Sequence, residues 1–532
     1  MTDRLRSARL DLSRRHLLRC FGAGAVTAFA LPLSTRPALA DPIFLTYPFQ
    51  LGVASGEPMP DGFVIWTRIA PEPLEIGHGM PAQPVEVRWE VAEDPAFRTI
   101  AQKGTAIAHP ELGHAVHVEV AGLKPGRPYH YRFTAGRERS LAGRAMTAPP
   151  PGAPLDRVRF AVAGCQHYEQ GYFTAHRHLA AQQPDFVFCY GDYIYEYRGN
   201  RVRNSREGPV ENVRQHFGDE VYSIEDYRRR YAQYKMDPDL QAAHAAAPWF
   251  VTWDDHEVEN NWVDLQDENG TPPAIFALRR QMAMQAYYEH MPLRASALPI
   301  GRAMQLYRHA RYGNLLDLHL LDTRQYRSNQ ACGDEWGVTC TDISRKDAEV
   351  LGERQHDWLM GNLARSDARW NALAQQIMVM DLDRAPGPDQ AENLDSWAGY
   401  RVPRERLLSG FRDRRLRNAV VLTGDEHQNF AGELHLDGRR PEREPVAVEF
   451  VATSISSGGD GEDQRPDMVK IQVENPQLKF NNSQRGYVLC DVTPERWLTD
   501  FLVLDKVTER DATVSSRARW AVEANSRRLT QA

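Results

Sequence analysis

Chemically active side chains follow short apolar runs at five places in this sequence. Each run has the composition of a strand buried inside an α/β sheet. The carboxyl ends of the strands in such a sheet border its ligand site, so we expect the side chains that follow them to converge. The five runs lead into Gly164-Cys165, Gly191-Asp192, Asp254-Asp255-His256-Glu257, Asp322-Thr323-Arg324 and Gly424-Asp425-Glu426-His427.

The types of these side chains indicate a centre that holds more than one metal ion. The Asp254–Asp255 pair places two like charges at a strand end, which is costly unless a cation or an arginine neutralises them. Asp192 and Tyr195 are three residues apart, and Asp425 and His427 are two apart, so each pair can reach one site. Carboxylates suit hard cations, whereas thiolate, phenolate and imidazole suit transition metals. We therefore expect two or more unlike metals that share a bridging carboxylate. Two such metals clamp the attacking and leaving oxygens of an in-line displacement at phosphorus.

The strands that must position these residues belong to a layered α/β region, which we expect from residue 151 onward. In this region, apolar runs alternate with longer helical segments, which is typical of sheets covered by helices. The expected strands lie at residues 160–163, 186–190, 249–253, 315–321 and 419–423.

A different pattern precedes this region. Residues 49–147 are divided by Gly and Pro and alternate between apolar and polar side chains, as half-buried antiparallel strands do. Val85, Val87 and Val91, for example, are separated by charged residues. The spacing predicts a small all-β, immunoglobulin- or fibronectin-like sandwich over residues 41–150, which the Pro/Gly-rich stretch 149–154 joins to residues 151–532.

Residues 1–40 have the composition of an export signal. The pair Arg14-Arg15 precedes a weakly apolar run from Cys20 to Leu33, and Ala38-Leu39-Ala40 ends the segment. A charged start, an apolar middle and an A-x-A end are typical of a secretory signal peptide, and the paired arginines indicate the twin-arginine export machinery. The apolar run is too short for a stable membrane span. We therefore predict a periplasmic or secreted protein.

Removal of this signal changes the charge and the cysteine count. The formal net charge goes from −7 to −12, and six cysteines become five. A chain this acidic is not expected to bind nucleic acid by bulk charge. An odd number of cysteines in an oxidising compartment leaves at least one free, bound to metal or paired between chains. Cys165 is our candidate ligand, with a small buried hydrophobe as its alternative, and a Cys332–Cys340 disulfide stays open.

Other candidates also have structural alternatives. Tyr195 taken alone would be a surface aromatic residue, and His256 taken alone a histidine of the core. Arg324 and Arg327 are close enough in sequence to pair with Asp322. An arginine fork also fits a phosphate group, and the sequence does not single out the arginine that would bind one.

Eight segments together resemble the PhoD family of alkaline phosphatases. They are spread in order over nearly the whole chain after residue 40, and in combination they are highly specific. They are 51–58 (LGVASGEP), 66–68 (WTR), 191–196 (GDYIYE), 253–258 (WDDHEV), 321–327 (LDTRQYR), 351–359 (LGERQHDWL), 424–427 (GDEH) and 485–487 (RGY).

This resemblance implies a calcineurin-like metallophosphatase domain behind the β-sandwich. Its fold would be a four-layer sandwich of mixed sheets flanked by helices, and its metals would be Fe³⁺ and Ca²⁺. Matched position by position, the residues that would bind iron are Cys165, Asp192, Tyr195 and His427. Asp192 would also bridge to calcium, which Asp425 would bind.

The resemblance also assigns the Asp-Asp-His-Glu segment. Asp255 stands where the wider superfamily has an asparagine ligand, and His256 stands where it has the histidine that faces the leaving group. Both Asp254 and Asp255 remain candidate metal ligands, because a slip of one residue along the strand reverses its faces. Gln477 departs from the family pattern, which has a histidine there, so the part this position plays in substrate binding is in doubt.

These observations predict an exported alkaline phosphatase. Metals would activate a hydroxide for attack on phosphomonoesters and phosphodiesters, and His256 would assist the leaving group. Two alternatives stay open: a phospholipase D or dedicated phosphodiesterase of the same fold, and a non-enzymatic exported protein that binds calcium.

Overall fold

The structure, a computed structural model, describes residues 42–200, 204–205, 208–209, 212–334, 339–385, 387–438, 440 and 442–532. The predicted export signal at residues 1–40 lies outside this part of the chain. No helix within the described ranges is both long enough and apolar enough to cross a membrane.

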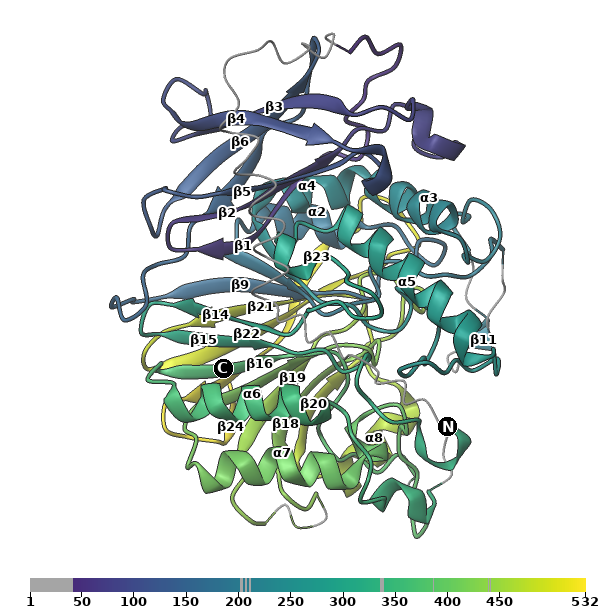
Figure 1. Cartoon of the computed structure of the whole chain (residues 1–532). Helices are drawn as coiled ribbons and strands as arrows, with labels where there is room; N and C mark the ends of the chain where they lie inside the picture. The colour runs from purple at the N-terminus through teal and green to yellow at the C-terminus, as the bar shows by residue number, and fades with distance from the viewer. Residues whose placement is uncertain are drawn as a thin grey trace, which may run out of the picture. The chain divides into compact units, whose positions relative to one another are not determined.

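A ten-stranded mixed sheet runs through the structure (Figure 1). Its central strands β9, β10 and β13 are parallel, and each is one of the runs expected from the sequence. In spatial order its strands are β24 (Leu529–Gln531), β23 (Val514–Glu523), β22 (Arg496–Leu504), β21 (Gly486–Val492), β9 (Val158–Ala163), β10 (Phe186–Cys189), β13 (Pro248–Val251), β1 (Val53–Met59), β2 (Gly62–Arg68) and β5 (Ala115–Val120).

A second, seven-stranded sheet packs against the first. Strands β15, β16, β17 and β19 are parallel, and β15 and β17 are the other two runs expected from the sequence. The order is β14 (Arg308–Tyr312), β15 (Leu316–Leu320), β16 (Trp370–Ala374), β17 (Ala419–Thr423), β19 (Ala447–Val451), β18 (Asn429–Leu434) and β20 (Leu478–Asn482). One buried cluster joins the facing sides of the two sheets, with Phe160 and Phe186 on one side and Leu318 and Trp370 on the other.

Helices cover the outer faces of both sheets (Figure 1). Trp249 and Val251 of the ten-stranded sheet pack in a cluster with residues of α2 (Thr174–Ala181), α3 (Ile224–Lys235), α4 (Pro238–Ala246) and α5 (Pro273–His290). Leu373 and Val421 of the seven-stranded sheet pack with residues of α6 (Gly352–Arg365), α7 (Arg401–Asp413) and α8 (Pro466–Glu474). These contacts explain why the strand interiors are apolar on both faces.

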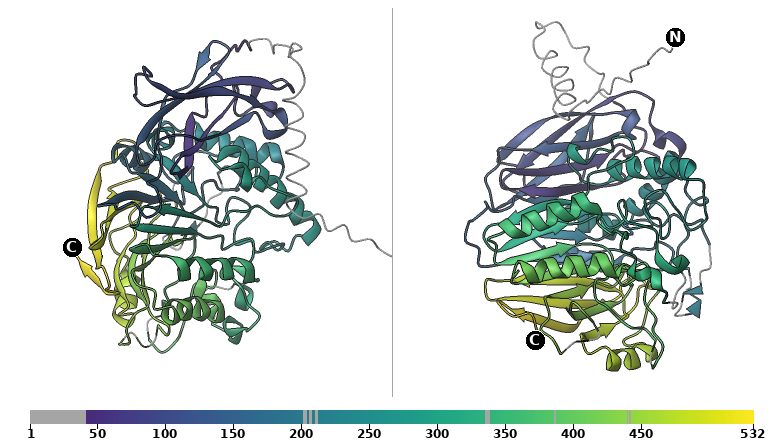
Figure 2. Two further views of the ribbon diagram at one scale, coloured as in Figure 1. Left: turned by 60° about the vertical axis from the view of Figure 1, so that its left-hand side comes forward. Right: turned by 60° about the horizontal axis from the view of Figure 1, so that its bottom comes forward.

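The N-terminal residues form an all-β region that shares the ten-stranded sheet. β1 pairs in parallel with β13, so β1, β2 and β5 continue that sheet (Figure 2). The remaining strands form a separate five-stranded sheet, and Val87 and Tyr131 of this sheet pack against Phe63 and Ile65 of β2. That sheet consists of β4 (Ile100–Ala108), β3 (Val85–Ala92), β6 (Pro128–Ala135), β7 (Glu138–Arg139) and β8 (Gly143–Met146).

A buried lysine joins the N-terminal strands to the helical layer. Lys235, the last residue of α3, is almost fully buried, and its Nζ lies 4.3 Å from the ring centroid of Trp66 on β2 and 5.2 Å from that of Tyr193. Burial lowers the pKa of Lys235 from 10.5 to about 7. The unfolded chain therefore binds a proton between these two values that the folded chain does not bind, and stability rises with pH across this window.

We expect Lys235→Met to remove this pH dependence. Between pH 7 and 9.5, the wild-type free energy of unfolding should gain about 1.4 kcal/mol per pH unit relative to the variant. Urea unfolding of both proteins across this range measures the difference. Lys124→Met, which removes a lysine whose side chain is 72% exposed, is the matched control and should give no such slope. If the free energies of unfolding of Lys235→Met and wild type changed in parallel with pH, the lowered pKa of Lys235 would be contradicted.

Candidate metal centre

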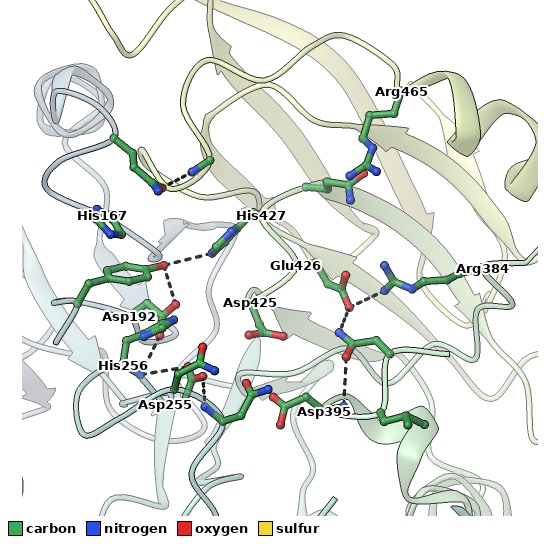
Figure 3. Close-up of a pocket in the computed structure, with 18 of the residues that line it drawn as sticks. His167, Asp192, Asp255, His256, Arg384, Asp395, Asp425, Glu426, His427 and Arg465 are labelled. Atoms are coloured by element: carbon green, nitrogen blue, oxygen red, sulfur yellow. Dashed lines mark hydrogen bonds and ion pairs between the residues drawn. The ribbon is translucent and has the colours of Figure 1, made fainter. Parts of the chain in front are cut away.

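The carboxyl ends of strands from both sheets meet at one polar cavity of about 540 Å³ (Figure 3). The expected residues Asp192, Tyr195, Asp255, Asp425 and His427 all line it. His256, the expected catalytic histidine, lines it as well. The prediction that the strand ends converge is therefore confirmed for these residues, although they come from two sheets.

The backbone is strained where the candidate ligands lie. Cys165, Asp192, Asp425 and His427 all have positive φ, between 50° and 65°, which is uncommon for residues other than glycine. Each such residue costs on the order of 1–3 kcal/mol, and strain of this kind clusters at functional sites.

The glycines that precede three of these ligands allow close packing. A Cβ atom on Gly164 would lie 2.5 Å from the ring of Tyr190, and one on Gly424 would lie 2.1 Å from the same ring. Gly191 has a φ of 131°, and a Cβ there would lie 2.4 Å from the backbone nitrogen of Asp254. The Gly-Cys and Gly-Asp pairs in the sequence thus have a steric cause.

Four donors of the kind that bind transition metals lie together in this centre. Tyr195 OH donates a hydrogen bond to Asp192 Oδ2 at 2.8 Å and lies 3.2 Å from His427 Nε2. The thiol of Cys165 donates to the same Asp192 oxygen at 3.3 Å. Thiol, carboxylate, phenol and imidazole thus surround one point at the cavity wall. This donor set fits a transition-metal ion.

Carboxylates gather beside these four donors. One oxygen from each of Asp254, Asp255 and Asp425 lies within 4.8 Å of the others, and Asp255 and His256 lie similarly close to Asp192. Asp255 lines the cavity, whereas Asp254 lies behind it, with one carboxylate oxygen buried and lacking a hydrogen-bond partner. The oxygen-rich donor set fits a hard cation such as calcium.

A single buried arginine connects most of these carboxylates. Arg324 contacts Asp254 through Nε and binds Asp395 Oδ2 through Nη1 at 2.8 Å. Its Nη2 lies 3.7 Å from both Asp255 and Asp425. This guanidinium partly neutralises the acidic cluster.

The structural alternative for Arg324 and Arg327, that their side chains pair with Asp322, is not what the structure shows. Arg324 bonds to Asp322 only through its backbone N–H. The side chains of both arginines bind Asp395, which lies about 70 residues further along the chain.

Burial shifts the acidities of the centre. Desolvation raises the pKa of Asp192, Asp425, Tyr195 and Cys165 well above their ordinary values, and the neighbouring carboxylates add to the effect. For His256, desolvation is outweighed by the nearby carboxylates, which raise its pKa. Such shifts are expected where cations are required to keep several groups ionised.

Glu196 orients His256, and the sequence analysis gave this glutamate no role. His256 Nδ1 lies 2.7 Å from Glu196 Oε2, and the imidazole lies against the ring of Tyr195, with centroids 4.1 Å apart. Its place next to Tyr195 in the GDYIYE segment was the available signal.

Two further polar residues hold the loops that carry the ligands. The carboxylate of Glu257 accepts hydrogen bonds from the backbone N–H groups of Asp192, Tyr193 and Asp254, at 3.1, 2.7 and 2.9 Å. Ser457 Oγ lies 2.7 Å from both Tyr195 OH and the carbonyl oxygen of Cys165. Glu257 thereby fixes the ends of β10 and β13 to each other.

Arginines line the other side of the cavity. Arg384 and Arg465 lie across from His256 (Figure 3). Arg485 donates to the carbonyl oxygens of Gly459 and His427, so it supports the loop that carries His427. Gln477 is not among the lining residues, and its Nε2 donates to the carbonyl oxygen of Asp381 at 2.6 Å.

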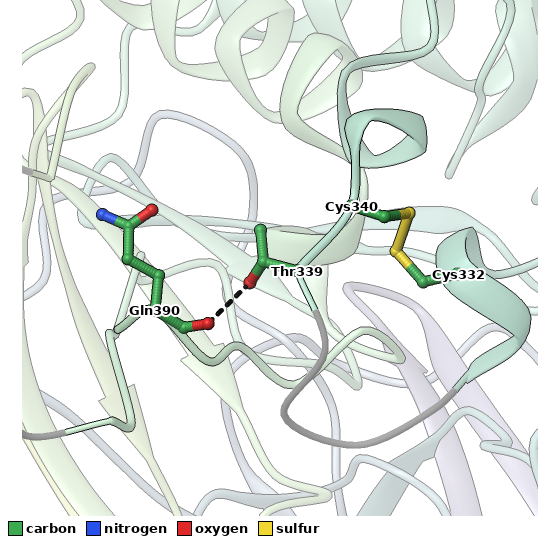
Figure 4. The surroundings of a disulfide bond; sticks show 4 residues. All are labelled: Cys332, Thr339, Cys340 and Gln390. Carbon is green, nitrogen blue, oxygen red and sulfur yellow. Dashed lines mark hydrogen bonds between the residues drawn. A yellow bond between two sulfur atoms is a disulfide. The ribbon is translucent and has the colours of Figure 1, made fainter. Parts of the chain in front are cut away.

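The question of the Cys332–Cys340 disulfide, open from the sequence, is answered by the structure, in which the bond is formed (Figure 4). Next to Cys332, Asp334 lines the cavity and accepts a hydrogen bond from Asn261 Nδ2 at 2.5 Å. Thr339 Oγ1, beside Cys340, donates to the carbonyl oxygen of Gln390 at 3.0 Å. The disulfide thus closes a loop at the cavity rim.

Comparisons with known proteins agree with this geometry. The model of the PhoD-like phosphatase family matches residues 160–501, and the model of the PhoD-like phosphatase N-terminal domain matches residues 36–149. Alkaline phosphatase D of Bacillus subtilis (strain 168) is 48% identical over 508 residues, which cover 94% of this chain and 86% of that protein. A solved structure described as "Structure of PhoD" superposes with a TM-score of 0.89 at 48% identity, covering 92% of this chain and 93% of that one. The chain therefore belongs to the PhoD-like phosphatase family.

Proposed function

We propose that this protein is an exported alkaline phosphatase that hydrolyses phosphomonoesters and phosphodiesters. The observation that carries the proposal is the convergence of Cys165, Asp192, Tyr195 and His427 beside an acidic cluster at the wall of one polar cavity, which the last three of these residues line. The name of the Bacillus relative, alkaline phosphatase D, supports the same activity. The packing of helices, two sheets and helices also supports a four-layer metallophosphatase sandwich over residues 151–532.

We propose Fe³⁺ and Ca²⁺ as the metals. Cys165, Asp192, Tyr195 and His427 would hold the iron, and Asp192, Asp255 and Asp425 would hold the calcium. Asp254 would support this set, because its Oδ1 contacts Arg324 and it is not among the residues that line the cavity. When bound, the two cations supply charge neutralisation at the phosphate and a water of lowered pKa.

The protein's own side chains would position the substrate and move the proton. Glu196 binds His256 Nδ1, which leaves Nε2 for the oxygen of the leaving group. The neighbouring carboxylates raise the pKa of His256, and the protonated imidazole is the form that can donate to that oxygen. Arg384 and Arg465 are our candidates for contact with the phosphate group or its second substituent.

Residues 1–40 would carry the chain through the twin-arginine export machinery to the periplasm or the medium.

The main rival activity is that of a phospholipase D or dedicated phosphodiesterase. Rates on bis-p-nitrophenyl phosphate and phosphatidylcholine, relative to p-nitrophenyl phosphate, distinguish these activities. The rival of another class is a non-enzymatic exported protein that binds calcium.

We expect Asp192→Asn and His427→Ala each to lower kcat/KM on p-nitrophenyl phosphate by at least about 100-fold. Each substitution removes a proposed iron ligand, and the iron would neutralise charge at the reacting phosphate. Metal analysis of the natively exported variants should show a loss of iron. Asp511→Asn and His109→Ala are matched exposed controls and should keep both iron and activity. Full activity in both site variants would refute the assignment.

A ferric ion bound by a tyrosinate should colour the protein. We expect the natively exported protein to show a visible charge-transfer band and the Tyr195→Phe variant to lose it, because the phenolate is the electron donor. Absorption spectra together with iron and calcium analysis make the test. A colourless wild-type protein that contains calcium alone would favour the non-enzymatic rival.

The effect of His256 should depend on the leaving group. Because p-nitrophenolate leaves without a proton, we expect His256→Ala to slow p-nitrophenyl phosphate hydrolysis modestly and glycerol phosphate hydrolysis by about 10²–10⁴-fold. Glu196→Gln, which weakens the hold on Nδ1, should show the same trend with a smaller effect. Equal losses on both substrates would show that His256 does not protonate the leaving group.

A further inference from the structure

A second group of metal-binding side chains lies on the hairpin of β14 and β15, at the edge of the seven-stranded sheet. His309 on β14 is directly opposite His319 on β15, and Asp317 is two residues before His319 on the same strand. Strand alternation places all three on one face of the hairpin. None of these three residues lines the polar cavity of the candidate metal centre.

We propose that His309, Asp317 and His319 form an additional site for a divalent transition-metal ion of the zinc type. One donor atom from each of the three lies within 4.8 Å of the others. His309 Nε2 lies 2.8 Å from Asp317 Oδ1, and the two imidazole centroids are 5.0 Å apart. Small side-chain rotations would bring three donors to the spacing of a tetrahedral ion with one open position.

The state of His319 is the second observation that indicates a ligand. Its side chain is completely buried, yet neither Nδ1 nor Nε2 has a hydrogen-bond partner. A buried imidazole without any partner gives up hydrogen bonds to water and gains none, so an unpaired histidine of this kind requires an explanation.

The surroundings of Asp317 orient its carboxylate toward the histidines. Ser366 donates to Asp317 Oδ2, and Arg311 Nη1 lies 3.4 Å from the same oxygen. The guanidinium of Arg311 is also held by Asp367 and by the carbonyl oxygen of Gly313. Oδ1 is therefore the oxygen that faces His309, and Oδ2 is fixed by supporting bonds, as in many metal sites.

The chemistry of the three donors selects the ion. Two imidazoles and one carboxylate suit Zn²⁺, Cu²⁺ or Ni²⁺ better than Ca²⁺ or Mg²⁺, which prefer sites made of oxygen atoms alone. An ion here would join β14, an edge strand, to β15. An ion that binds the folded chain alone would stabilise the folded state by mass action.

Zinc titration of the holoenzyme tests the proposal. We expect isothermal titration to show one Zn²⁺ ion per wild-type chain, with an increase in the melting temperature. His309→Ala and Asp317→Asn should weaken this binding by about 100-fold and remove the increase. The side chain of His309 is 37% exposed, so its removal leaves the core intact. His109→Ala, which removes an exposed imidazole beside Glu111, is the matched control and should bind as wild type does.

A spectroscopic readout separates this site from the catalytic centre. With one equivalent of Cu²⁺, the wild type should show electron paramagnetic resonance couplings from two imidazole nitrogens, and His309→Ala should show fewer. Phosphatase activity should be unchanged in His309→Ala. Equal zinc affinity and identical copper spectra in wild type, His309→Ala and Asp317→Asn would overturn the proposal, and the three residues would then form only a hydrogen-bonded network.

Discussion

The structure depends on the neutralisation of negative charge in a buried place. Asp254, Asp255, Asp395 and Asp425 surround the guanidinium of one arginine, Arg324, and Asp192 adds a further carboxylate next to them. Arg327 adds a second positive charge at Asp395, but desolvation and the repulsion between carboxylates still raise the pKa of Asp192 and Asp425. Bound cations would favour the ionised carboxylates. Without such cations, burying this many carboxylates together would cost folding free energy.

Strained backbone and close packing hold this cluster in place. A Cβ atom on either glycine before Cys165 and Asp425 would clash with the ring of Tyr190, whose hydroxyl donates to the carbonyl oxygen of Thr453 at 2.9 Å. Glu257 adds a carboxylate that ties the loop after β10 to the loop after β13. Because the candidate ligands take left-handed φ values, the fold must supply contacts that hold them, and the two packed sheets provide a rigid frame for these contacts.

The sequence predicted the parts of this centre that depend on local pattern. All five apolar runs became strands, and Cys165, Asp192, Tyr195 and His427 came together because each lies at or beside the end of one of them. The parallel pairing of β1 with β13 was not visible, because each N-terminal strand looks the same whether its partner is near or far in sequence. The choice between Asp254 and Asp255 likewise depends on the position of Arg324, about 70 residues away.

The two proposed metal sites differ in how far apart their donors lie along the chain. The donors of the candidate metal centre come from loops after strands of two sheets, so periodicity within one segment cannot reveal their geometry. The donors on the β14–β15 hairpin lie within eleven residues, and a turn at Gly313 sets their register. Alternation on two antiparallel strands places His309, Asp317 and His319 on one face. This shared face can be deduced from the sequence once the hairpin register is known. Only the structure adds the decisive fact, that His319 is buried with neither ring nitrogen bonded.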